Sequence, residues 1–147
     1  MPNWCENSLE VNGPKEEVKK FVEFVKGTDT EWEGDGEEQV LSFQKILPVP
    51  KAVVKKGFDK TGYNWCSKNW GTKWSASDVE FTKNTPNNVV YEFMTAWSPP
   101  TPVVKALAKK FPKLTLILKY DEPGVGFRGH LTMEKGKVAH DVCKNIY

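Results

Sequence analysis

The chain has few cysteines, and they form none of the patterns that cross-link small folds. Cys5, Cys66 and Cys143 are odd in number, far apart, and contain no CxxC pair. This arrangement excludes a disulfide framework and gives no zinc-binding signature. Because unpaired cysteines are typical of reducing compartments, we expect the protein to be cytoplasmic.

Long hydrophobic runs are also lacking. No apolar stretch approaches the ~20 residues that a membrane helix needs, and the first residues have neither the basic start nor the apolar core of a signal peptide. We therefore expect no membrane partner.

Neither sign of charge is in large excess. The 21 basic and 19 acidic side chains leave a net charge of +2, too little for a protein-wide field that attracts polyanions. A role in nucleic-acid binding would therefore require a local basic patch. At 147 residues with 39% hydrophobic content, we expect one folded domain spanning residues 1–147.

One segment, residues 28–38, contains six acidic residues and no basic ones. Its acids lack the ligand spacing and distal glutamate of a calcium-binding EF-hand loop. We interpret it as a solvated loop and expect no metal site there.

Periodicity near the start predicts a strand followed by a helix. Polar and apolar residues alternate over residues 4–11, which is typical of a half-buried strand. A helix begins after Pro14 and ends near Gly27, because apolar residues at positions 18, 21, 22 and 25 form one helical stripe.

The middle of the chain has weaker signals. Residues 40–47 are apolar enough for a short strand or extended segment. We expect a helical turn at residues 51–56 and a loop at residues 57–62. Residues 63–70 predict a short helix that ends at Gly71.

Clear alternation returns in the second half. Strands at residues 78–82 and 89–97, joined by a turn at 84–88, predict a β-hairpin. A helix follows, capped by Ser98 or Thr101 and ended by Pro112. Strands are expected at residues 114–120 and 127–133, separated by a turn at 121–124; the form of the C-terminal tail is left open.

The order of these elements predicts the fold class. Without an insertion at residues 28–77, the chain gives strand, helix, strand, strand, helix, strand and one further C-terminal strand. This is the α+β, ferredoxin-like split βαβ sandwich, an antiparallel sheet with two helices on one face. The name concerns shape alone: the chain has no cluster-binding cysteine run, and we expect no cofactor.

Four motifs also resemble a known family. They are MPNWCEN at residues 1–7, NWGTKW at 69–74, TAWSPP at 95–100 and YDEPG at 120–124, followed by Phe127 and Gly129. In this order they are similar to the YubB-type ferredoxin-like domains of plasmids, phages and prophages. The resemblance extends from the first residue to about Gly129. It implies the ferredoxin-like fold and a mobile-element origin, and it supplies no catalytic residues.

Three of the six tryptophans fall within the polar segment at residues 63–74. Large rigid rings of this kind either pack on the core or form a binding platform. In the first interpretation, Trp70, Trp74 and Trp97 pack together and pin the insertion onto the sheet. In the second, a binding surface is formed by Asn69, Trp70, Lys73, Trp74, Trp97 and Arg128.

The function that we expect is that of a non-catalytic binding or accessory protein of a mobile element, with a host or phage protein as partner. A second hypothesis is nucleic-acid or nucleotide binding, with residues 127–130 beside Tyr91 and Phe93, although this strand lacks the full RNA-binding signature. A third is an enzyme that pairs His130 with Cys5 or Cys66, although the sequence contains no catalytic motif.

Overall fold

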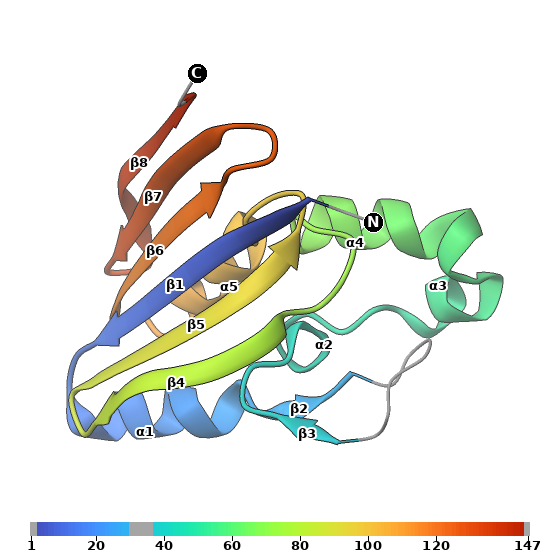
Figure 1. The fold of residues 1–147 in the computed structure, drawn as a ribbon. Helices are drawn as coiled ribbons and strands as arrows, with labels where there is room; N and C mark the ends of the chain where they lie inside the picture. Colours follow the sequence, from blue (N-terminus) through green and yellow to red (C-terminus); the bar gives the residue numbers. More distant parts are fainter. Residues whose placement is uncertain (1–2, 30–36, 146–147) are drawn as a thin grey trace.

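A computed structural model of the chain describes residues 3–29 and 37–145, and its main element is a six-stranded antiparallel sheet (Figure 1). The strands lie in the order β4-β5-β1-β6-β7-β8. Their bounds are Trp4–Asn12 (β1), Ser77–Thr85 (β4), Asn88–Ala96 (β5), Thr115–Glu122 (β6), Phe127–Glu134 (β7) and Lys137–Asn145 (β8).

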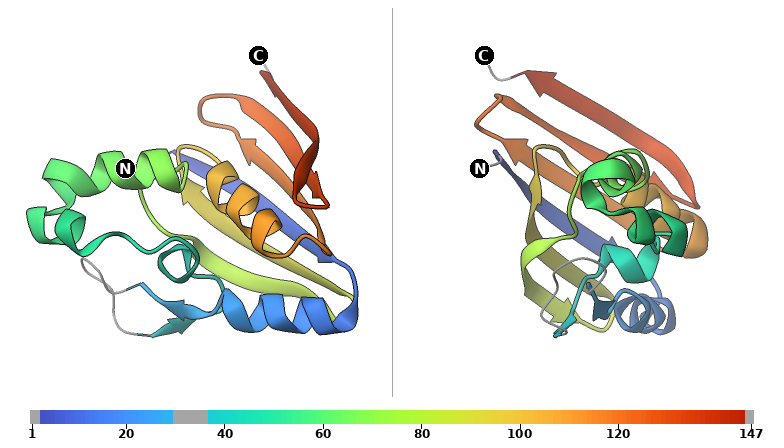
Figure 2. Two further views of the ribbon diagram at one scale, coloured as in Figure 1. Left: turned by 180° about the vertical axis from the view of Figure 1, so that it is seen from behind. Right: turned by 90° about the vertical axis from the view of Figure 1, so that its right-hand side faces the viewer.

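Two helices, α1 (Lys15–Phe24) and α5 (Thr101–Lys110), cover one face of this sheet and leave the other face open (Figure 2). The alternation in β1 predicted this arrangement, because its buried residues lie on the helix-covered face. Phe21 of α1 contacts Tyr91 of β5 and Phe111 after α5, at ring-centroid distances of 6.1 and 5.4 Å. These rings join both helices to the sheet in one core.

The predicted fold class is confirmed. The four strands β4-β5-β1-β6, together with α1 and α5, have the split βαβ topology of a ferredoxin-like domain. The two remaining strands extend the sheet beyond β6.

The sequence left the C-terminal tail undefined, and it forms strand β8. Lys135 and Gly136 both have a left-handed backbone, with φ of 53° and 76°, which is the geometry of a tight hairpin turn. Almost every residue of β8 is exposed. No buried face imposes alternating hydrophobicity on this strand, so periodicity could not reveal it.

The insertion contains short elements that pack beside the sheet. They are β2 (Gly27–Thr28), β3 (Glu38–Gln39), α2 (Phe43–Ile46), α3 (Lys51–Lys56), the π-helix η1 (Phe58–Gly62) and α4 (Tyr63–Asn69). Leu41, Phe43, Cys66 and Trp70 from this segment are buried in the main core. None of the helices in the described part of the chain is long and apolar enough to cross a membrane.

Two predictions within the insertion were wrong. Residues 40–47 contain the short helix α2 instead of a strand, because the Ser42 side chain accepts a hydrogen bond from the Lys45 N–H at 3.2 Å and caps it. Residues 58–62, within the predicted loop at 57–62, form η1, since the Gly62 N–H donates to the Gly57 carbonyl at 3.2 Å. Within the acidic segment, Asp29 accepts a hydrogen bond from Ser42, and residues 30–36 lie outside the described residues.

Two boundary predictions near α5 and β6 were also wrong. Helix α5 begins after Pro100 without a side-chain cap, so neither Ser98 nor Thr101 caps it. Pro102, in its first turn, has no N–H and so leaves one fewer donor to satisfy. Asp121 and Glu122 end strand β6 rather than forming the turn, because both pair with residues of β7.

Candidate functional site

Trp70 lies in the core. It is 1% exposed, and its indole N–H donates to the Leu47 carbonyl at 2.9 Å. Its ring meets Phe43 and Trp65 edge-on, at 5.8 and 5.9 Å. Asn69 is similarly occupied, because its side chain donates to the Trp65 carbonyl at 2.9 Å. Trp70 therefore anchors the insertion in the core, the Asn69 amide is used within α4, and both offer little to a ligand.

The other two tryptophans of the predicted site are on the surface. Trp74 is 39% exposed and Trp97 is 44% exposed. The Trp74 ring lies 6.1 Å from that of Trp4, at the start of β1, and the Lys73 ammonium is 4.2 Å from the Trp74 ring centroid. Because Trp4 pairs with Ala96, Trp97 lies at the same end of the sheet. We call Trp4, Lys73, Trp74 and Trp97 the tryptophan rim.

Trp97 has an unusual backbone conformation. Its φ is 70°, in the left-handed region, which costs a residue with a Cβ roughly 1–2 kcal/mol. Several hydrogen bonds hold the segment. Among them, the Trp97 N–H donates to the Asn3 carbonyl at 2.8 Å, the Thr95 hydroxyl to the Ser98 carbonyl at 2.6 Å, and the Ser98 hydroxyl to the Gly71 carbonyl. The surroundings thus fix an exposed ring in a costly conformation.

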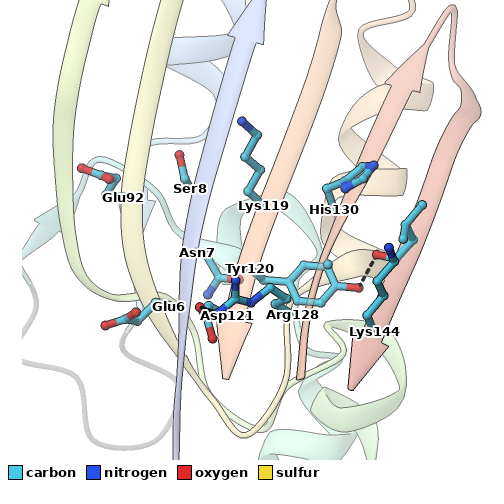
Figure 3. A pocket seen from close by; sticks show the side chains of 12 residues that line it. Glu6, Asn7, Ser8, Glu92, Lys119, Tyr120, Asp121, Arg128, His130 and Lys144 are labelled. Atoms are coloured by element: carbon cyan, nitrogen blue, oxygen red, sulfur yellow. Dashed lines mark hydrogen bonds and ion pairs between the residues drawn. The ribbon is translucent and has the colours of Figure 1, made fainter. Parts of the chain in front are cut away.

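Arg128 lies apart from the rim, in a hollow of about 490 Å³ on the open face of the sheet (Figure 3). The hollow has carboxylates on one side and basic side chains on the other. They are Glu6 and Glu92, opposite Lys119, Arg128, His130 and Lys144. The Arg128 guanidinium lies 3.5 Å from the Asp121 carboxylate, so much of its charge is already balanced. The predicted site residues therefore divide among the core, the rim and this hollow.

The aromatic and basic surface predicted for nucleic-acid binding does not form at these strands. Tyr91 and Phe93 are buried on the helix-covered face, whereas Arg128 and His130 line the hollow on the open face. The prediction placed residues 127–130 beside the two rings, but the sheet separates Arg128 and His130 from them. Phe127 packs against the core instead, 6.2 Å from the Tyr120 ring.

Cys5 cannot pair with His130, as the enzyme hypothesis required. Cys5 is fully buried on the helix-covered face, while His130 lies on the open face. Burial raises the pKa of the Cys5 thiol to about 12, against the smaller opposing effect of a hydrogen bond with Thr95. A thiol that stays protonated at neutral pH is a poor nucleophile.

Thiol labelling tests this description of the cysteines. Cys5 and Cys66 are buried, and Cys143 is exposed on β8. We expect a water-soluble thiol reagent to modify Cys143 rapidly in the folded protein, and the other two only after denaturation. Mass spectrometry of the labelled peptides checks this; rapid modification of Cys5 under native conditions would contradict the structure.

Sequence reasoning missed Trp4 as a member of the rim, and the carboxylates of the hollow. The signal for Trp4 was present, because it alternates with Cys5 and shares the outer face of β1 with Glu6. The hollow had no local signal, since it combines residues from β1, β5, β6, β7 and β8.

Together, the split βαβ topology, the helix-covered core and the open sheet face define a ferredoxin-like α+β domain. A family model described as "Ferredoxin-like domain in Api92-like protein" matches residues 64–145. Since this match covers more than half of the chain, the protein belongs to that family.

A solved structure agrees with this assignment. The crystal structure of a protein api92 from Yersinia pseudotuberculosis matches with a TM-score of 0.78, over 97% of this chain and 98% of that chain. The sequence identity is 13%, so the similarity concerns the fold alone. No curated protein matches the chain.

Proposed function

We propose that this protein is a non-catalytic binding protein that recognises a protein partner through the tryptophan rim. The observation that carries the proposal is Trp97, which is 44% exposed and has a left-handed backbone. Strained conformations of this kind concentrate at functional sites. Glycine or asparagine would fit this backbone at lower cost, so the large ring is better explained by recognition than by folding.

The chemistry of the rim favours a protein over a charged ligand. Tryptophan is enriched among the residues that dominate protein–protein binding energy, because it buries a large area and loses little side-chain entropy. Val125, 59% exposed on the β6–β7 turn, extends the apolar area. This turn is adjacent to the start of β1, because a Cβ on Gly124 would contact Asn3, which precedes Trp4 of the rim. Lys73 is already engaged with the Trp74 ring.

The biological setting is also part of the proposal. The resemblance to YubB-type domains supports an origin in a plasmid, phage or prophage, with a host or phage protein as the partner. The small, odd number of widely spaced cysteines supports action in a reducing cytoplasm.

Replacing Trp97 with glycine separates recognition from stability. The substitution removes the ring but also relieves the strained backbone, so we expect the free energy of unfolding to change by less than about 1 kcal/mol. Partner binding is expected to weaken by about 2 kcal/mol, or roughly 30-fold, as for other dominant interface residues. Urea denaturation measures the first quantity.

Partner binding is measured by retention from host lysate. Wild-type protein and variants are immobilised, and the proteins that each retains in concentrated salt are compared. A partner of the rim is retained by wild type, lost with Trp97→Gly and Trp74→Ala, and kept by Tyr63→Ala. Tyr63 is a suitable control because it is 48% exposed and lies on α4, outside the rim. Equal retention by all four proteins would refute the proposal, as would the absence of any selectively retained protein.

A further inference from the structure

A stretch without acidic residues covers α5 and most of β6. Between Glu92 and Asp121 the chain contains five lysines and no aspartate or glutamate. Lys105 and Lys109 are four residues apart in α5, so their side chains point to the same side of the helix. Lys113 follows, three residues after the helix ends. The near-neutral charge of the whole chain conceals this local excess.

The β7–β8 hairpin brings more lysines to the same place. Its turn packs against the end of α5: a Cβ placed on Gly136 would lie 3.5 Å from the Ala108 carbonyl oxygen and 3.9 Å from the Lys109 Cα. This contact brings the turn's two lysines beside the helix, as Figure 2 also shows for the two elements. We call the resulting set the lysine patch; it consists of Lys105, Lys109, Lys110, Lys113, Lys135 and Lys137.

Little balances the charge of the lysine patch. Within the described residues, the ion pairs join Lys20 to Glu17, Lys26 to Glu23 and Arg128 to Asp121, and none includes a lysine of the patch. The nearest acids in the strands are Glu134, opposite Lys137, and Asp141, further along β8. Five of the six lysines are exposed and Lys105 is half-buried, so the exposed ammonium groups are available to an external anion.

From this geometry we infer that the lysine patch binds the phosphate backbone of double-stranded nucleic acid without reading its sequence. Lys105 and Lys109 are separated by ~6 Å along the helix axis. Together with the lysines after the helix and on the hairpin turn, they offer a group of positive charges to a polyanion. Arginine, the residue that most often reads bases, is absent from the patch.

The duplex is favoured over a single strand because the patch offers no ring on which bases could stack. Phe111 is 7% exposed, and the Phe24 ring is covered by the ammonium groups of Lys45 and Lys110, at 5.5 and 4.5 Å. The exposed apolar neighbour is Val138, which is aliphatic. A protein partner is less favoured, since the patch has no aromatic anchor.

This site is separate from the tryptophan rim. Met133, just before the turn, pairs with Leu116, and Leu116 pairs with Val11 near the end of β1. Trp4 is at the opposite end of β1. The two surfaces can therefore be tested independently, and the inference goes beyond the proposed function.

The test measures fluorescence anisotropy of a labelled duplex of about 20 base pairs in about 50 mM salt, where non-specific binding is strong. The variant carries Lys109→Gln, Lys113→Gln and Lys135→Gln. The control carries Lys51→Gln, Lys55→Gln and Lys56→Gln, which remove the same charge from α3. We expect the first variant to bind at least about tenfold more weakly, and the control to bind nearly as wild type.

The salt dependence gives a second readout. If the three lysines each contact a phosphate, the slope of log affinity against log salt falls by about 2.7, from three contacts at about 0.9 each. Circular dichroism confirms that both triple variants are folded. Trp97→Gly is expected to bind the duplex as wild type does, so failure of the rim proposal leaves this one intact.

Three outcomes would overturn the inference. The first is wild-type protein that does not bind the duplex in low salt. The second is equal weakening in the two triple variants, which would indicate a response to net charge alone. The third is preference for poly-glutamate or for single-stranded DNA over the duplex, which would assign the patch to an acidic protein or to a stacking ligand.

Discussion

Replacing Trp70 with alanine is expected to lower the free energy of unfolding by about 3–5 kcal/mol. The side chain is 1% exposed and packs in the core cluster, against Phe43 and Trp65 of the insertion. Its removal leaves a cavity lined by Phe43 and Trp65, which the surrounding elements can close only in part. It also leaves the Leu47 carbonyl without the hydrogen bond that the indole N–H donates to it.

Urea denaturation monitored by circular dichroism measures this loss. The matched control is Trp74→Ala, since Trp74 is 39% exposed and has Trp4 as its main ring contact; we expect it to cost less than about 1.5 kcal/mol. Trp70→Phe keeps much of the volume but loses the hydrogen bond, and should fall between the two. Similar losses for Trp70→Ala and Trp74→Ala would contradict the burial that the structure gives these residues.

The two tryptophans show where sequence reasoning stops. The tryptophans of residues 63–74 left two interpretations open, rings packed together on the core or rings forming a binding platform, and the structure contains both a buried and an exposed ring. Trp70 follows α4 and faces the core, whereas Trp74 lies beyond Gly71, whose φ of 82° turns the chain away. The direction after such a turn depends on tertiary contacts, here with Pro99 and Pro102, and no local pattern encodes it.

The fold could be predicted wherever one face of an element is buried. Apolar and polar residues alternate along strands β1, β5 and β6, because helices cover one side of each strand. The sequence pattern therefore indicates which side is buried. Strand β8 is exposed along almost its whole length, so its sequence has no such pattern. In α2, four residues are too few to establish a helical period, and the Ser42 cap was the only signal.

The lysine patch was partly visible in the sequence. The acid-free stretch between Glu92 and Asp121 could have indicated a basic helix surface. The contribution of Lys135 and Lys137 could not be foreseen, because it depends on the hairpin turn packing against α5. Charge that is averaged over a chain therefore gives little information about charge at a surface.

A substitution at Gly129 is expected to cause the second large loss of stability. The sequence places a glycine inside a strand, which often marks a close approach of another group. In the structure that group is Tyr120, whose phenol oxygen would lie 2.5 Å from a Cβ at position 129. The Tyr120 hydroxyl donates to the Val142 carbonyl at 3.5 Å. Burial is the main factor that raises the pKa of Tyr120, so the hydroxyl stays protonated and keeps this role.

Gly129→Ala is expected to lower the free energy of unfolding by about 3 kcal/mol, because the new methyl group would overlap both Tyr120 and the Val142 backbone carbonyl. The backbone contact decides the size of the effect, since a carbonyl within the β7–β8 ladder cannot move without breaking pairing. Gly124→Ala is the control: its Cβ would meet the Asn3 side chain at 2.6 Å, which can rotate away at a cost of about 1 kcal/mol. Adding Tyr120→Leu to Gly129→Ala should restore little stability, because it leaves the Val142 clash in place. Full recovery in the double variant, measured by urea denaturation, would show that the phenol ring alone limits this position.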